Sequence, residues 1–88
     1  MFFYTYVLLS KLDNKFYIGY TPNDVFYRFS KHTDGLVEST KHRRPLELIY
    51  YEAFLNELDA IRREKYFKTS KGRTTLKYMI RNYLETKN

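Results

Sequence analysis

Residues 17–32 (YIGYTPNDVFYRFSKH) constrain the fold of this chain most, because a strand signal runs directly into a helix start. The aromatic and β-branched residues up to Tyr20 favour a strand. Thr21 is predicted to be the N-cap of a helix, with Pro22 at the first helical position and Asp24 three residues after the cap, as in a capping box. The chain is therefore expected to pass from strand to helix at Thr21.

One face of this predicted helix carries two basic residues. Arg28 and His32 are four residues apart and therefore lie on the same side of a helix, next to an apolar stripe that includes Phe29. Gly19, in the preceding strand, has no side chain, so another segment can approach it closely. We expect Tyr17 to converge there with Arg28 and His32, in an arrangement that can hold a phosphodiester.

The rest of the chain predicts two more strands and two more helices. Residues 2–10 form a β-branched and aromatic run in which neither face is polar, so this strand is expected at the centre of a sheet. Residues 11–14 predict a hairpin turn. Residues 46–54 predict a third strand, Asn56 is expected to cap a second helix, and residues 76–84 carry apolar side chains at helical spacing. The order ββαβαα indicates an α+β fold, a small sheet with helices packed on it.

Composition excludes several classes of protein. The 88 residues are enough for one domain, residues 1–88, and an aromatic content of 19% supports a packed interior rather than disorder. The absence of cysteine excludes a disulfide framework and a thiolate zinc site. No apolar run has bilayer length and the N-terminus lacks the pattern of a signal peptide, so we expect a cytoplasmic protein with no membrane partner.

Positive charge is concentrated late in the chain. The net charge is +6, and residues 62–81 contain eight basic residues and one acidic residue, a net charge of +7. A basic face is typical of a protein that binds a polyanion, although solvated helix faces are also rich in Lys and Arg. The tyrosines interleaved with these charges favour nucleic acid as the partner.

The tyrosine motifs and the helix that follows them resemble the GIY-YIG nuclease superfamily. Residues 17–19 (Tyr-Ile-Gly) match the second half of its motif, and residues 4–6 (Tyr-Thr-Tyr) stand where the first half has Gly-Ile-Tyr. Arg28 matches the arginine that the family carries on the next helix. The spacing and length are similar to those of the small stand-alone, single-domain bacterial members, the YhbQ-like group. The resemblance covers nearly the whole chain and implies a three-stranded antiparallel sheet flanked by three helices.

The resemblance also implies roles for five residues in the hydrolysis of a phosphodiester. Tyr6 would activate the attacking water with the help of His32. Tyr17 would orient that water or contact the phosphate, and Arg28 would stabilise the negative charge of the transition state. Glu64, the one acid of the basic segment, would bind a divalent cation, Mg²⁺ or Mn²⁺. Without the resemblance, a structural role is the simpler interpretation for each of these residues. The two tyrosines would fill the core, the arginine would lie on the surface, the histidine would support the fold and the glutamate would form a salt bridge.

The expected activity is that of a metal-dependent endonuclease that acts on DNA rather than RNA, including structured or single-stranded DNA. The alternative is a non-catalytic nucleic-acid-binding module with the same fold. We expect a monomer or weak dimer, with a protein partner that supplies specificity, because the chain carries no second DNA-binding domain. Asn82 is the nearest match to an asparagine found downstream in several family members. The basic residues expected to bind the nucleic acid are Lys41, His42, Arg43, Arg44, Arg62, Arg63, Lys68, Lys71 and Arg73.

Overall fold

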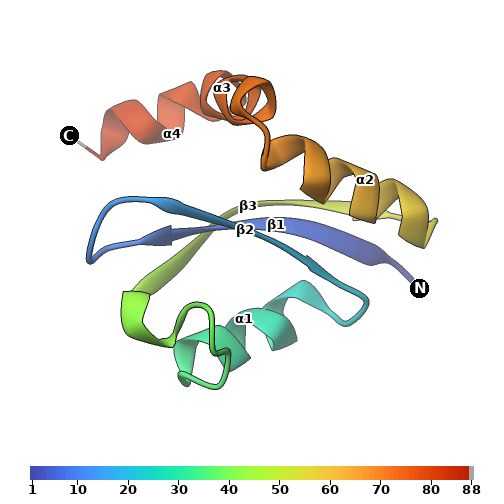
Figure 1. Cartoon of the computed structure of the whole chain (residues 1–88), viewed down its shortest axis with the longest axis horizontal. Coiled ribbons are helices and arrows are strands. Elements are labelled where there is room, and N and C mark those ends of the chain that lie inside the picture. Colours follow the sequence, from blue (N-terminus) through green and yellow to red (C-terminus); the bar gives the residue numbers. More distant parts are fainter. Residues whose placement is uncertain (88) are drawn as a thin grey trace.

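A computed structural model describes residues 1–87 and contains a three-stranded sheet with helices on both faces (Figure 1). No helix among these residues is long and apolar enough to cross a membrane. The strands are β1 (Phe3–Ser10), β2 (Phe16–Thr21) and β3 (Leu46–Phe54). The helices are α1 (Val25–Thr33), α2 (Glu57–Phe67), α3 (Ser70–Met79) and α4 (Arg81–Thr86), with a short 3-10 helix, η1 (Lys41–Arg43).

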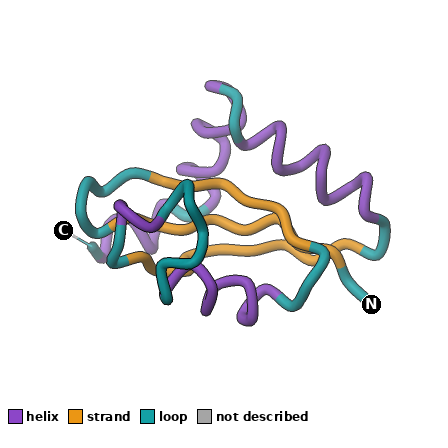
Figure 2. Tube along the Cα trace, turned by 60° about the horizontal axis from the view of Figure 1, so that its bottom comes forward, coloured by secondary structure: helices purple, strands orange, loops and turns teal. Residues whose placement is uncertain are grey.

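β1 is the central strand, as its two apolar faces predict. It pairs antiparallel with both neighbours in the order β2-β1-β3, which confirms the antiparallel sheet (Figure 2). Side chains alternate along β1: Tyr6 and Leu8 pack with Val25 of α1, whereas Val7 packs with Phe67 of α2 on the other face. The sheet therefore separates two small cores, and the one beneath α1 contains the tyrosine of the first motif.

The start of α1 differs from the prediction. Its N-cap is Asp24, whose carboxylate accepts a hydrogen bond from the amide of Phe26 at 2.9 Å, so the prediction of Thr21 as the cap is wrong. Thr21 is instead the last residue of β2, where it pairs with Tyr4, and its hydroxyl accepts a hydrogen bond from the amide of Asn23. The ladder with β1 holds Thr21 in the strand, so the helix begins only after a bend at residues 22–23.

The last predicted helix is divided into α3 and α4 at Ile80, whose backbone leaves the helical region (φ −110°, ψ 26°). Thr69 ends the turn after α2 and caps α3, because its hydroxyl accepts a hydrogen bond from the amide of Gly72 at 3.0 Å. A Cβ atom at Gly72 would lie 1.8 Å from the carbonyl oxygen of Tyr66. The glycine therefore lets α3 pack closely on α2, and α2, α3 and α4 lie over the face of the sheet opposite α1 (Figure 1).

Candidate active site

Tyr6 lies at the centre of a hydrogen-bonded cluster between β1 and α1. Its hydroxyl is 2.8 Å from Nε2 of His32 and accepts a hydrogen bond from Nε of Arg28 at 3.4 Å. The ring of Tyr17 lies beside them, with its centroid 6.5 Å from that of Tyr6 and 5.4 Å from that of His32. The structure thus brings together four of the five residues expected at the site, and we call Tyr6, Tyr17, Arg28 and His32 the Tyr6 cluster.

Gly19 makes this convergence possible. It stands opposite Tyr6 in the β1–β2 ladder, and a Cβ atom at this position would lie 2.3 Å from Cζ of Tyr6. The ring of Tyr6 therefore lies over the backbone of β2, where no other residue type leaves room for it. Arg28 and His32 reach the same point from α1 because they are separated by one helical turn.

His32 connects the cluster to a residue that sequence analysis missed. Its Nδ1 atom is 2.7 Å from Oγ1 of Thr40, and both residues are fully buried. Arg28 can only donate, so the proton of the Tyr6 hydroxyl is directed to Nε2 of His32. Nδ1 then carries the single N–H proton of the neutral imidazole and donates it to Oγ1 of Thr40, which defines the tautomer of the ring.

The loop before η1 supplies a second missed contact. The hydroxyl of Ser39 donates a hydrogen bond to the hydroxyl of Tyr17 at 3.3 Å. Ser39 and Thr40 lie in a polar loop with no helical or strand periodicity, so nothing in the sequence distinguishes them from their neighbours. Their proximity to the Tyr6 cluster arises only when the loop folds back against α1 and β2.

Burial shifts the pKa values of the two buried members of the cluster, His32 and Tyr6, in opposite directions. Desolvation, with a smaller contribution from the charge of Arg28, lowers the pKa of His32 to about 4. Desolvation also raises the pKa of Tyr6, against the hydrogen bond from Arg28, which favours the phenolate. At neutral pH the cluster therefore holds a neutral phenol and a neutral imidazole beside one permanent cation.

Glu64, the fifth expected residue, lies on α2, which covers the face of the sheet opposite α1 (Figure 1). Its carboxylate forms an ion pair with Nζ of Lys68 at 3.0 Å, and its side chain is only 18% exposed. The negative charge of Glu64 contributes to the raised pKa of Tyr6, so the carboxylate lies within electrostatic range of that hydroxyl. Whether it joins the Tyr6 cluster in function stays a prediction.

The side chains available as ligands limit how a divalent cation could be held. Residues 1–87 contain no group of three or more His, Cys, Asp or Glu side chains placed to hold a metal. A cation held by Glu64 would therefore take most of its ligands from water and phosphate oxygens. That combination suits Mg²⁺, which keeps much of its hydration shell and is often held by one or two carboxylates.

Four of the predicted nucleic-acid-binding arginines form contacts within the protein: Arg43 with Asp13 and Phe16, Arg62 with Asp59, and Arg63 and Arg44 as follows. Arg63 donates to both carboxylate oxygens of Glu52, at 2.8 and 3.1 Å, and its guanidinium lies 4.3 Å from the ring centroid of Phe67. Arg44 donates to the carbonyl of Thr33 at 3.3 Å. Apart from Arg63 and Arg44, the predicted binding residues are exposed or half-buried on η1 (Lys41, His42, Arg43), on α2 (Arg62), directly after α2 (Lys68) or on the N-terminal part of α3 (Lys71, Arg73).

Comparison with known proteins agrees with this geometry. The sequence profile of the GIY-YIG catalytic domain matches residues 2–81. A UPF0213 protein from Pediococcus pentosaceus is 39% identical over 87 residues, which cover 98% of this chain and 90% of that protein. The UPF0213 protein SH2523 of Staphylococcus haemolyticus is 41% identical over 75 residues, covering 84% of this chain and 89% of that protein.

A solved structure has the same fold. The solution NMR structure of the UPF0213 protein BH0048 from Bacillus halodurans aligns with a TM-score of 0.56 at 33% sequence identity. The alignment covers 90% of this chain and 85% of that one. With its tyrosine pair, the glycine that accommodates Tyr6 and the arginine on α1, the chain belongs to the GIY-YIG family, a family of the nuclease type.

Proposed function

We propose that this protein is a metal-dependent endonuclease that hydrolyses phosphodiester bonds in DNA. The observation that carries the proposal is the position of the Tyr6 hydroxyl between a proton acceptor, Nε2 of His32, and a permanent cation, Arg28. A tyrosine that only fills a core needs a single polar partner for its hydroxyl. A tyrosine that relays a proton needs both an acceptor and a stabilising charge.

In the proposed reaction a water molecule attacks the phosphorus and gives its proton to the oxygen of Tyr6, while the P–O bond to the leaving strand breaks and the leaving oxygen takes a proton from solvent. Tyr6 gives its own proton to Nε2 of His32 in the same step, so no free phenolate forms. The coupling avoids the phenolate of Tyr6, which burial disfavours. Burial also disfavours the imidazolium of His32, so His32 releases the proton again once the P–O bond has broken. The hydrogen bond from Nδ1 to Thr40 keeps Nε2 unprotonated and available before the reaction.

Arg28 and Tyr17 would bind the phosphate. The guanidinium of Arg28 uses Nε for Tyr6 and has further N–H groups that can donate to the phosphate oxygens as negative charge develops. The hydroxyl of Tyr17 is available beside it to contact the phosphate or to orient the water. Glu64 would hold the divalent cation, which, when bound, neutralises charge on the phosphate.

A non-catalytic nucleic-acid-binding module is the second candidate, and one observation favours it. Tyr6 is 1% exposed and His32 is fully buried, so almost nothing of either side chain is open to a substrate. A protein that retains the fold and the basic residues but binds without cleaving needs no closer access.

The deciding experiment is incubation of the full chain with labelled single-stranded, nicked and branched DNA, and with matching RNA, in Mg²⁺ or Mn²⁺. We expect cleavage of at least one DNA substrate. Arg28→Ala should lower the rate about 100- to 1,000-fold with a modest loss of affinity. Lys31→Ala is the matched control, because Lys31 lies on the same helix but contacts the ring of Tyr27. Binding without cleavage of any substrate would favour the second candidate.

A further inference from the structure

A basic cleft of about 550 Å³ lies outside the Tyr6 cluster, where the β1–β2 hairpin, η1 and α3 meet. Its lining includes Lys15, Arg43, Arg73 and Lys77, with Asp13 and Phe16. We propose that this cleft binds the phosphate backbone of an unpaired nucleic-acid strand beside the bond that is cleaved. The inference rests on the proposed function and identifies where the substrate strand continues.

The charge of the cleft is strongly positive. Four basic side chains line it against one carboxylate, that of Asp13. This carboxylate is already engaged, because it accepts a hydrogen bond from the amide of Lys15 at 3.0 Å and lies 3.8 Å from Nε of Arg43. Lys15, Arg73 and Lys77 are exposed, so their charges face whatever enters the cleft. A phosphate group would therefore meet an excess of positive charge that the fold itself does not neutralise.

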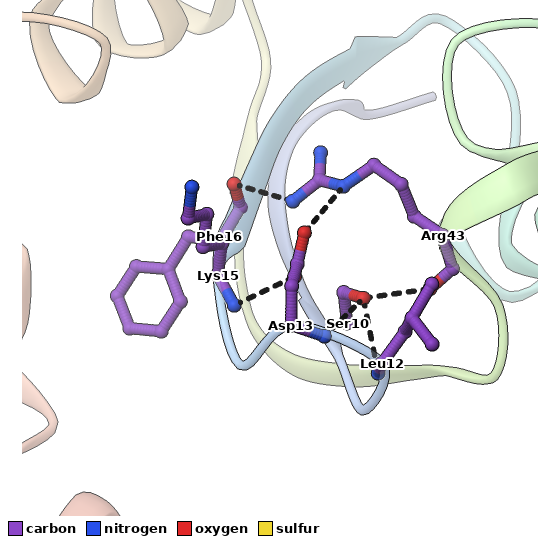
Figure 3. Close-up of polar contacts among 6 residues, drawn as sticks. All are labelled: Ser10, Leu12, Asp13, Lys15, Phe16 and Arg43. Carbon is purple, nitrogen blue, oxygen red and sulfur yellow. Dashed lines mark hydrogen bonds and ion pairs between the residues drawn. The ribbon is translucent and has the colours of Figure 1, made fainter.

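Arg43 is held in place before any ligand binds. Figure 3 shows its guanidinium between the carboxylate of Asp13 and the carbonyl of Phe16, to which Nη2 donates at 3.3 Å. The carbonyl of Arg43 in turn accepts a hydrogen bond from the buried hydroxyl of Ser10 at 2.7 Å. These contacts engage Nε and Nη2, so the Nη1 end of the guanidinium has donors for a phosphate oxygen. Because the side chain is already ordered, binding loses less entropy.

The cleft adjoins the Tyr6 cluster through two chain segments. Phe16 and Tyr17 are consecutive in β2, so their side chains lie on opposite faces: Tyr17 packs with Tyr6, and Phe16 packs on the α3 side. The loop that contacts Tyr17 and His32 runs directly into η1, which carries Arg43. A strand bound at Tyr17 can therefore continue around the end of β2 into the cleft.

Phe16 favours an unpaired strand as the occupant. Aromatic rings beside a basic groove bind single strands, because an unpaired base can stack on the ring while its phosphate meets the cations. Phe16 is half-buried and is one of the residues that line the cleft. Bases paired inside a duplex cannot stack on it in this way.

The double variant R73Q/K77Q tests the cleft, because both residues are exposed and lie one turn apart on α3. K65Q/R81Q is the matched control, because both residues are exposed, neither lines the cleft, and the change of charge is the same. Binding to a labelled single-stranded DNA and to its duplex is measured by fluorescence anisotropy in chelator, as a function of salt. We expect R73Q/K77Q to weaken single-strand binding about tenfold or more. The slope of log K against log salt should fall by about 1.4, since each lost phosphate contact removes about 0.7.

Phe16→Leu should weaken single-strand binding by roughly fivefold or more, with an unchanged salt slope, because a stacking contact is lost and no charge is removed. Equal losses of single-strand affinity in R73Q/K77Q and K65Q/R81Q would overturn the cleft as a binding site and favour diffuse electrostatic attraction. If R73Q/K77Q lost as much affinity for the duplex as for the single strand, the proposal that the cleft binds an unpaired strand would be overturned. If R73Q/K77Q shows the cleft-specific loss of affinity but the wild-type protein cleaves no substrate, the result supports the cleft and contradicts only the proposed nuclease activity.

Discussion

The hydroxyl of Tyr6 lies 2.8 Å from Nε2 of His32, and neither side chain is more than 1% exposed. Such a polar pair is tolerated between apolar layers because its hydrogen bonds are complete. Among residues 1–87, no buried side-chain nitrogen or oxygen lacks a partner. Arg28 and Thr40 supply the two outer contacts of the pair. The site is therefore one connected network, in which a change at one member alters the others.

Tyr6→Phe should stop cleavage while the protein stays folded. Loss of the hydroxyl removes the proton relay, which typically contributes about 100- to 10,000-fold in rate. The free energy of unfolding should fall by about 1–3 kcal/mol, because buried Nε2 of His32 loses its partner. Tyr4→Phe is the control, on the same strand and the same face. Single-turnover cleavage and urea unfolding measure the two effects, and equal cleavage rates for the two variants would contradict the role of Tyr6.

His32 should make the stability of the fold depend on pH. Its pKa falls from 6.5 in the unfolded chain to about 4 in the folded one. Between these values the unfolded state binds more protons, so stability is full above the upper value and decreases as the pH falls through the window. The loss should reach at most about 3 kcal/mol. Urea unfolding across this pH range should show this loss of stability in the wild type. The His42→Gln variant should show it as well, because the side chain of His42 is exposed. A similar decline in His32→Gln would show that another group is responsible.

Thr40→Val should lower the rate of cleavage, because the imidazole of His32 loses the hydrogen bond that fixes its orientation. The substitution keeps the shape of the side chain but leaves Nδ1–H buried without an acceptor, which destabilises the fold by about 1–3 kcal/mol. Thr40→Ser, which keeps the hydroxyl, should restore most of the rate and the pH profile of cleavage. If Val and Ser variants have the same pH profile, Thr40 serves only the fold and does not position His32.

Gly19→Ala should displace the ring of Tyr6. The added Cβ atom would lie 2.3 Å from Cζ of Tyr6, a clash that costs about 1–3 kcal/mol of stability if the ring shifts. Cleavage should fall with it, because the hydroxyl leaves His32 and Arg28. The cost should shrink when the ring is absent, so Gly19→Ala should destabilise the Tyr6→Leu variant less than the wild type. Additive losses of stability in this double-mutant cycle would contradict the contact.

Glu64→Gln should separate binding from cleavage. If Glu64 holds the cation, the variant loses cleavage, whereas its affinity for DNA is unchanged or slightly higher, because a negative charge leaves a basic segment. Chelation of divalent ions should have the same effect on the wild type. Glu85→Gln, an exposed position on α4, is the control with the same change of charge. Cleavage at the wild-type rate by Glu64→Gln in chelator would exclude the metal mechanism.

Local signals in the sequence determined the order of the elements and much of the Tyr6 cluster. The two apolar faces of residues 2–10 predicted the central strand, Asn56 predicted the start of α2, and the third strand has the predicted bounds. These features depend on side chains within a few residues of one another, so they can be recognised without the fold. The resemblance to the GIY-YIG superfamily, carried by short motifs, then selected Tyr6, Tyr17, Arg28 and His32 from many similar residues.

Only the tertiary structure decided which other residues meet these four. The contact of Thr40 with His32 and the cleft between Arg43 and Arg73 join segments that no local pattern relates. The start of α1 shows the same limit, because pairing of Thr21 with Tyr4 in the ladder prevailed over a local capping signal. Contacts between distant segments form when whole faces are buried together, and the free energy of that burial outweighs the small preferences that a short stretch of sequence expresses.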